Sequence, residues 1–511
     1  MTEAQSPSGT GACYRALLSL LGSDKVHHPG SDGHTSCVSS YWAQQQQQAE
    51  QPACVVTPRS AEDVSAAVRC LVSTAEALKD DPAEVAACRF AIRSGGHLPV
   101  TGAASQAGGV VLDLRLLNAI EVSPDRRTAR IGAGATWGEV YAKLDPLGLS
   151  VAGGRAAQVG VGGLTTGGGY SFMSPRYGWT CDTASSFQVV LADGSIVEAN
   201  ADENSDLWWA LRGGGNNFGV VTAITMETFE QGKIWGGNVY HLLSTIDDQL
   251  KAFVDFNSAD GYDENASLIT SFGYATGQGA AIANCIEYIK AEENPAVFAP
   301  LMKIPSLFSN VRLDSVSNIC LGQGALSKQN MRQLFATVTH ASTLPMLQST
   351  YTHWNKSLPA VENVPGMVWS ISLEPLPPAI YQRAARAAPA SGGKNCMGLD
   401  AANDNDGQRS KKDALVITLL SATWADAADD EKVERAAREM MDGIERDAKA
   451  LGAWHPFVYL NYAAPWQDPI ASYGEEALGR LLEVRKRVDP KGVFTRLVPG
   501  GFKIPGAVEG Q

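Results

Sequence analysis

Short apolar runs alternate with helical patterns through the first 230 residues and predict a domain of mixed α and β structure. The runs at 54–58, 90–93 and 109–114 are typical of short buried strands. Ser60, with Asp63 three residues later, predicts the start of a helix, because a serine side chain there can accept a hydrogen bond from the third backbone N–H. We therefore expect layered strands and helices rather than a pure helical or pure β fold.

The pattern changes after about residue 230. Longer helical stretches then alternate with β-rich runs such as 268–274 and 367–374. This arrangement predicts a second domain built on an antiparallel sheet with helices on one side. The segment 390–412 is rich in Gly, Asn, Asp and Lys, and predicts a surface loop. Near residue 455 the first pattern returns, with a helix predicted over 478–488.

Two glycine-rich segments carry the strongest chemical signal. One is Arg93-Ser94-Gly95-Gly96-His97, and the other runs from Val159 to Tyr170 with six glycines. Such backbone can approach a ligand closely and can aim several N–H groups at the phosphates of a dinucleotide. A Rossmann fold is not favoured, because the pattern Gly-x-Gly-x-x-Gly, started at Gly160, reaches Thr165 where a glycine is needed.

The glycine-rich segments and further motifs resemble the vanillyl-alcohol oxidase and p-cresol methylhydroxylase flavoproteins. Within that group the likeness is to the berberine-bridge-enzyme-like branch, and above all to its fungal members. The motifs follow one another in the order of the family and cover roughly residues 50–230 and 455–505. They are 93–97, 159–170, 174–179, 189–195, 206–222, 459–462 and 488–494.

This resemblance implies an α+β fold class. It predicts an FAD-binding domain of the p-cresol methylhydroxylase type, made of two small subdomains, with a substrate domain inserted into it. The expected bounds are 1–230 and 455–511 for the two parts of the FAD-binding domain. The substrate domain, with its antiparallel sheet and flanking helices, is expected over 231–454.

The resemblance also implies which residues hold FAD. His97 would carry the flavin through a covalent 8α-N-histidyl bond. Ala156 stands where many relatives have a cysteine that forms a second bond, so we expect attachment through His97 only. The cofactor-binding residues implied are Arg93, Ser94, Gly95, Gly96, His97, Val159, Gly160, Gly162, Gly163, Leu164, Gly167, Gly168, Gly169, Val221 and Asn461.

Two of these positions bear on the reaction. Val159 occupies the place that gates oxygen access to the flavin in the family, and a valine there goes with oxidase behaviour. We therefore expect O2 as the electron acceptor. Leu164 stands where the plant alkaloid enzymes have histidine, which argues against their particular substrate chemistry.

Oxidation needs a base that removes a proton from an alcohol or an acidic C–H while a hydride moves to flavin N5. Along 369–374, Ser370, Ser372 and Glu374 alternate with Trp369, Ile371 and Leu373, so they share one face of a strand. The corresponding strand of relatives lies over the flavin, which makes Glu374 the first candidate. The other catalytic candidates are Tyr459 and Tyr462.

These expectations describe an FAD-linked oxidase that acts on a small-molecule alcohol or activated C–H, reduces O2 to H2O2 and serves secondary metabolism. An oligosaccharide oxidase is an alternative, and Trp354, Trp369, Trp454 and Trp466 could line the aromatic groove that it needs. A cyclase that keeps the flavin fold with no net redox chemistry is another, because fold does not determine chemistry. A non-catalytic flavoprotein is the third.

The composition of the chain argues against some classes of binding partner. A net charge of −13 provides no basic surplus to neutralise nucleic-acid phosphates, and also disfavours an anionic membrane surface. No apolar run of 18 residues predicts a transmembrane helix. The acidic, polar N-terminus lacks the pattern of a secretory signal and favours an intracellular protein. The oligomeric state cannot be predicted.

The cysteines and histidines suggest no further centre. The nine cysteines are expected to be reduced and buried, although Cys70 and Cys88 could pair across a helix. His27, His28, His34 and Cys37 lie close in sequence, but their spacing matches no zinc pattern, so we expect no metal. The five glutamines 44–48 predict a solvated helix face.

Overall fold

Two sheets lie within the first 230 residues of the computed structural model, which describes residues 11–48, 51–258, 261–382, 395–399 and 414–506. The first has the order β1-β2-β4-β3, with β2, β4 and β3 parallel and β1 antiparallel. The second has the order β5-β6-β10-β8-β9 and is antiparallel throughout. Their strands are β1 (Val26–His27), β2 (Cys54–Val56), β3 (Phe90–Arg93), β4 (Val110–Asp113), β5 (Ile120–Val122), β6 (Thr128–Gly132), β8 (Ala184–Val190), β9 (Ile196–Asn200) and β10 (Val220–Glu227).

A nine-stranded antiparallel sheet organises the middle of the chain. Its order is β15-β12-β14-β13-β18-β19-β17-β20, and β16 pairs with β12. Its strands are β12 (Ile234–His241), β13 (Ala266–Ala275), β14 (Gly279–Tyr288), β15 (Phe308–Ser309), β16 (Arg312–Asp314), β17 (Arg332–Ala341), β18 (Val368–Leu376), β19 (Leu415–Trp424) and β20 (Trp454–His455). A small ribbon pairs β7 (Leu149–Ser150) with β11 (Phe229–Glu230).

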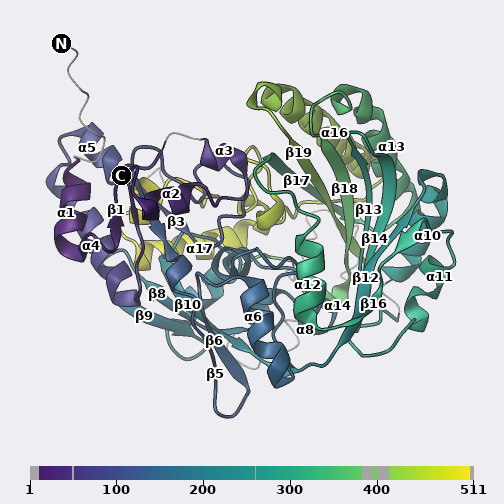
Figure 1. Cartoon of the computed structure of the whole chain (residues 1–511), viewed down its shortest axis with the longest axis horizontal. Coiled ribbons are helices and arrows are strands. Elements are labelled where there is room, and N and C mark those ends of the chain that lie inside the picture. The colour runs from purple at the N-terminus through teal and green to yellow at the C-terminus, as the bar shows by residue number, and fades with distance from the viewer. Residues whose placement is uncertain (1–10, 49–50, 259–260, 383–394, 400–413, 507–511) are drawn as a thin grey trace.

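Long helices cover the outer face of this large sheet, while the other face turns toward the first two sheets (Figure 1). The covering helices are α10 (Ile246–Phe256), α11 (Ala299–Met302), α13 (Leu344–Val361) and α16 (Asp430–Ala450). The predicted antiparallel sheet with helices on one side is therefore confirmed. The helix α17 (Glu475–Val488), near the C-terminal end, returns to the first two sheets, as predicted (Figure 1).

The remaining helices, most of them short, mostly pack on the first part of the chain. Ser60 caps α4 as predicted, because its hydroxyl accepts a hydrogen bond from the Asp63 N–H at 3.2 Å. The helices are α1 (Ala12–Leu21), α2 (Asp32–Val38), α3 (Gln44–Gln47), α4 (Ala61–Ala77), α5 (Pro82–Ala87), α6 (Trp137–Leu144), α7 (Val161–Thr166), α8 (Ser174–Tyr177), α9 (Ser205–Leu211), α12 (Val316–Gly324), α14 (Pro378–Tyr381) and α18 (Val493–Arg496).

Two large hydrophobic cores match the two kinds of sheet. One lies among the first sheets and the C-terminal helix, and the other lies between the large sheet and its outer helices. Two stretches of the middle segment join the first core. They are α12, through Val316, Ile319 and Cys320, and the residues Leu376, Ile380, Tyr381, Cys396, Met397 and Leu399. The domain bounds at 230 and 455 stay a prediction, while the change of sheet occurs between β11 and β12.

The cysteine prediction is wrong at one pair. Cys13 and Cys88 form a disulfide that joins α1 to the end of α5. Sequence spacing suggested Cys70 with Cys88, but the side chain that folding brings beside Cys88 belongs to a helix 75 residues earlier.

We expect the double variant Cys13→Ala/Cys88→Ala to lose about 2–5 kcal/mol of unfolding free energy, because the bond closes a long loop in the unfolded chain. Urea unfolding measures this loss, and the reducing agent dithiothreitol should lower the stability of the unmodified protein by a similar amount. Cys70→Ala, at a half-buried free thiol, is the control. An equal loss in Cys70→Ala would contradict the assignment.

The glutamine prediction is also corrected. Gln46 is buried, and its amide donates to the Leu98 carbonyl at 2.6 Å. Gln45 donates to the Gln333 carbonyl of β17 at 2.6 Å. The tract therefore ties the N-terminal segment to the large sheet rather than facing solvent. The loop predicted at 390–412 lies outside the described residues, except for 395–399.

No helix in the described ranges is long and apolar enough to cross a lipid bilayer.

Candidate active site

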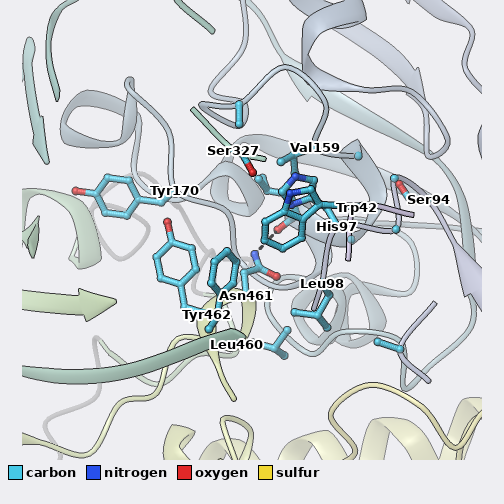
Figure 2. Close-up of a pocket in the computed structure, with 18 of the residues that line it drawn as sticks. Trp42, Ser94, His97, Leu98, Val159, Tyr170, Ser327, Leu460, Asn461 and Tyr462 are labelled. Carbon is cyan, nitrogen blue, oxygen red and sulfur yellow. Dashed lines mark hydrogen bonds between the residues drawn. The ribbon is translucent and has the colours of Figure 1, made fainter. Parts of the chain in front are cut away.

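A cavity of about 500 Å³ opens between the glycine-rich segments and the inner face of the large sheet. Figure 2 shows its centre, with Trp42 and His97 together on one side and Tyr170 and Tyr462 on the other. Most of the predicted site residues line it. They are Ser94, Gly95, Gly96, His97, Val159, Gly160, Gly162, Gly163, Leu164, Val221 and Asn461 for the cofactor, and Glu374, Tyr459 and Tyr462 for catalysis.

Arg93 is not among the residues that line the cavity, and its role as a cofactor ligand stays a prediction. Its guanidinium is buried, donates to the backbone carbonyls of Cys37 and Ser40, and lies 4.0 Å above the Tyr41 ring. The arginine therefore fixes the strand that leads into Gly95 and Gly96.

The two glycine segments meet backbone to backbone at Gly95 and Gly160. A Cβ atom on Gly95 would lie 2.5 Å from the Gly160 nitrogen, and one on Gly160 would lie 2.2 Å from the Gly95 nitrogen. Only glycine permits this approach, which leaves the backbone of both segments on the cavity wall. The second segment forms the short helix α7 (Val161–Thr166) directly after Gly160.

Gly167, Gly168 and Gly169 are not among the residues that line the cavity, and their role as cofactor ligands stays a prediction. A Cβ on Gly167 would lie 2.2 Å from the Asn461 side chain. Gly168 and Gly169 have positive φ angles of 109° and 86° and pack against Met397 and Thr180. These glycines are needed because protein side chains approach them.

His97 fits the role of a flavin carrier. Its ring stacks on Trp42, with centroids 4.1 Å apart and planes at 9°. Its Nε2 atom is buried without a hydrogen-bond partner among the described residues. Burial lowers the pKa of His97 to about 4, so the imidazole is neutral at pH 7. A neutral ring nitrogen keeps the lone pair that a covalent bond to a cofactor requires.

Arg155, Glu374 and Tyr462 form a closed cluster on the cavity wall. Arg155 Nη2 donates to the Tyr462 hydroxyl at 2.6 Å and lies 2.9 Å from Glu374 Oε2. The Tyr462 hydroxyl in turn donates to Glu374 Oε1 at 2.9 Å. Burial and the adjacent Glu374 carboxylate raise the pKa of Tyr462 well above its usual value. The tyrosine is therefore protonated at rest and linked directly to a carboxylate.

The strand β18 presents this carboxylate as its sequence predicted. Ser372 and Glu374 line the cavity, whereas Trp369, Ile371 and Leu373 are buried against the outer helices. The alternation places Glu374 on the inner face of the sheet. In the neighbouring strands, Ile269 lies on the same face.

Tyr459 and Asn461 support the cavity floor. The Tyr459 hydroxyl accepts hydrogen bonds from the Gly169 N–H at 3.0 Å and from Asn461 Nδ2 at 3.1 Å. Asn461 Nδ2 also donates to the Leu164 carbonyl at 3.0 Å. Tyr459 is 1% exposed. The Tyr459 hydroxyl is therefore occupied by hydrogen bonds within the protein. Of the two tyrosines, Tyr462 is the one that bonds to a carboxylate.

A second carboxyl lies behind the wall. Glu287 on β14 is fully buried, and burial raises its pKa to about 8. The Cys285 thiol, which lines the cavity, donates to Glu287 Oε1 at 2.9 Å. Glu287 is therefore neutral at pH 7 and adds no charge to the site.

Sequence reasoning missed Arg155 and Trp42. Arg155 is the one charged residue in the stretch 151–157, whose other residues are small and apolar. Its isolation there is the one feature of the sequence that could have marked it as functional. Trp42 lies in the polar N-terminal region, and no pattern in the sequence marked it, because only folding brings it to His97.

The four tryptophans considered for a sugar groove do not line the cavity. Trp354 and Trp369 are core residues, Trp454 packs with Lys449, and Trp466 packs with Arg438.

Comparisons with known proteins agree with this geometry. Residues 52–200 match the FAD binding domain family. FAD-dependent monooxygenase CTB5 from Cercospora beticola is 33% identical over 510 residues, which cover 98% of this chain and 93% of CTB5. Oligopeptidase PhomG' from Diaporthe leptostromiformis is 44% identical over 493 residues, or 96% of this chain. The chain spans only 37% of the length of PhomG'.

Two solved structures share the whole fold. A berberine bridge enzyme variant in complex with (S)-reticuline has a TM-score of 0.72 at 17% identity, with 98% of this chain and 99% of the other covered. Glucooligosaccharide oxidase from Acremonium strictum, described with a 6-S-cysteinyl, 8α-N1-histidyl FAD, has a TM-score of 0.71 at 20% identity, with 96% and 98% covered.

Fold, cavity and relatives together define an FAD-linked oxidoreductase with an FAD-binding domain of the p-cresol methylhydroxylase type. The chain belongs to the family of fungal FAD-dependent proteins that includes CTB5, and it shares its fold with berberine bridge enzyme.

Proposed function

We propose that the protein oxidises a small molecule of fungal secondary metabolism at an alcohol or activated C–H, with O2 as the final acceptor. One observation carries the proposal: a single cavity has the partnerless His97 nitrogen and the glycine backbone on its wall, together with the Arg155–Glu374–Tyr462 cluster. A cofactor and a proton acceptor would therefore meet in the same space.

The residues present fit FAD. The backbone of Gly95 and Gly160 provides the close approach that a dinucleotide requires, and His97 provides a neutral nitrogen for a covalent bond. FAD, when bound, supplies a two-electron acceptor that takes a hydride from the substrate and passes the electrons to O2, giving H2O2. Cys285 is the one cysteine on the cavity wall in the described ranges, and it lies on the large sheet. We therefore propose attachment through His97 alone.

Tyr462 and Glu374 would act as one proton acceptor. A proton taken from the substrate by the Tyr462 oxygen can be matched by transfer of the tyrosine proton to Glu374, 2.9 Å away. Arg155 stabilises the negative charge that moves between them. This coupling avoids a free phenolate, whose formation the raised pKa of Tyr462 opposes.

Val159 and the wall composition support the choice of acceptor and substrate. Val159 lines the cavity beside Gly160, which supports the proposal that it controls access of O2 to the flavin. The inner face of the sheet contributes Ile269, Phe335 and Leu419. Apolar walls of this kind favour a compact, mostly apolar substrate over a sugar oligomer.

The test is a substrate panel of alcohols, ketones and sugar oligomers with the purified yellow protein, followed by O2 consumption and H2O2 release. H2O2 in proportion to product supports the oxidase. Incorporation of label from ¹⁸O2 into product instead supports a monooxygenase, as CTB5 is named. Product formed without O2 consumption means a cyclase, and bound flavin without any turnover means a binding protein.

We expect Ala156→Cys to add a second covalent bond to the flavin, because Ala156 lines the cavity where relatives carry a cysteine. The decisive measurement is on the double variant His97→Ala/Ala156→Cys, which should keep flavin through denaturation where His97→Ala does not. Ala157→Cys, at the buried neighbour outside the cavity lining, is the matched control. Loss of flavin from the double variant would argue against this placement.

A further inference from the structure

Arg155 carries a hydrogen-bond donor that has no partner within the described part of the chain. Its Nη1 atom is buried and has no partner among the described residues. The side chain is only 11% exposed, so water does not replace the missing partner freely. A buried N–H without an acceptor is costly, and such groups in native proteins call for an explanation.

Glu374 and Tyr462 bond to the other terminal nitrogen of Arg155 rather than to Nη1. Nη2 already serves both Glu374 oxygens and the Tyr462 hydroxyl. The Tyr170 ring covers the face of the guanidinium at 4.7 Å. Because Arg155 itself lines the cavity, an acceptor for Nη1 can come from a molecule bound there.

We propose that Arg155 Nη1 binds a carbonyl oxygen of the substrate, and that the bond oxidised is the Cα–Cβ bond next to that carbonyl. This inference rests on the proposed function and names its substrate class, a ketone with hydrogen on both the α and β carbons. Of the two reactions in the proposed function, it favours oxidation at an activated C–H over oxidation of an alcohol.

The charge of the site supports a neutral carbonyl rather than an anion. The Arg155 cation is already balanced by the Glu374 carboxylate at 2.9 Å. Arg155 cannot bind a substrate carboxylate in the bidentate way that uses both terminal nitrogens, because Nη2 already bonds to Glu374 and Tyr462. Lys328 is the other cation on the wall and is exposed to solvent. One free nitrogen matches one acceptor oxygen.

The chemistry balances with groups already named. The α proton goes to the Tyr462 oxygen while the tyrosine proton passes to Glu374. The β hydrogen leaves with its bonding electron pair as a hydride for bound FAD, and the Cα–H pair becomes the second bond between Cα and Cβ. Arg155 Nη1 donates a hydrogen bond to the carbonyl oxygen and stabilises the negative charge that develops there during the reaction. A donor lowers the reaction barrier most when it is placed where charge develops.

The test compares binding of 1-tetralone, 1-tetralol and tetralin to the anaerobic holoenzyme by calorimetry, so that it does not depend on turnover. We expect the ketone to bind about tenfold more tightly than either comparator, the effect of one buried hydrogen bond that is otherwise unmade. Arg155→Lys should reduce this preference to within about twofold. Lysine can keep the ion pair with Glu374, but it has no second nitrogen for the substrate.

Lys328→Met, which removes the other cation on the wall, should leave the preference unchanged. Arg155→Met repeats the test without any charge, and thermal unfolding identifies a variant that is merely unstable. The proposal is overturned by equal or tighter binding of the alcohol, by a preference that survives in folded Arg155→Lys, or by failure of all three probes to bind.

A second readout separates this inference from the oxidase proposal. In D2O, the anaerobic enzyme should exchange the α hydrogens of 1-tetralone, as followed by NMR, and Arg155→Lys should slow the exchange at least tenfold. Exchange without O2 consumption would preserve the carbonyl site while rejecting the oxidase. Oxidation of alcohols without exchange would preserve the oxidase while rejecting the carbonyl site.

Discussion

His97→Ala is expected to abolish covalent attachment of flavin, so that denatured protein loses all yellow colour and in-gel fluorescence. The reason is chemical: His97 lines the cavity, its imidazole is neutral and its Nε2 has no partner among the described residues, and Ala156 offers no second nucleophile. Mass mapping provides the direct measurement. Trypsin releases residues 94–115, and this peptide contains His97 as its single histidine and no cysteine.

The matched control is His34→Ala. His34 is also buried, but its Nε2 is 3.1 Å from the Pro52 carbonyl, and it does not line the cavity. Flavin mass should stay on peptide 94–115 in this variant. Flavin that remains covalent in His97→Ala, or flavin mass on another peptide of the unmodified protein, would contradict the assignment of His97.

Local features of the fold could be predicted because their causes are local. The strand over 90–93 and the cap at Ser60 depend on neighbours within four residues. The alternation along β18 likewise predicted that Glu374 faces inward, because a strand has a fixed period of two. Such signals survive in a single sequence.

The features that could not be predicted from the sequence depend on contacts between distant segments. Arg155 meets Glu374 across 219 residues, and Cys13 meets Cys88 across 75. No local pattern selects these partners over others. Gln45 and Gln46 similarly bond to backbone carbonyls that only folding brings near.

The missing side chain of glycine serves different neighbours at different places in this chain. At Gly95 the absent Cβ allows the Gly160 backbone to approach on the cavity wall. At Gly168 and Gly169 the same absence allows Met397 and Thr180 to approach from within the protein. A sequence shows that a side chain is missing but not which atoms occupy the space.

The second large effect is expected for Tyr462→Phe, which should slow substrate-dependent flavin reduction by about 100-fold or more. The change removes the oxygen that lies between Arg155 and Glu374 and leaves the carboxylate paired with the arginine. Stopped-flow absorbance under anaerobic conditions isolates this step from the reaction with O2. Flavin content and its covalent attachment should be unchanged, because Tyr462 and His97 act on different partners.

Tyr473→Phe is the control, since the Tyr473 hydroxyl is also buried and donates to the Gly213 carbonyl at 2.9 Å outside the cavity lining. Glu374→Gln should slow reduction as well, yet it leaves Arg155 without its counter-charge and should also lower stability by about 3–5 kcal/mol. Tyr462→Phe therefore separates chemistry from folding. A reduction rate within threefold of the unmodified enzyme would exclude Tyr462 as the proton acceptor and leave Glu374 to act directly on the substrate.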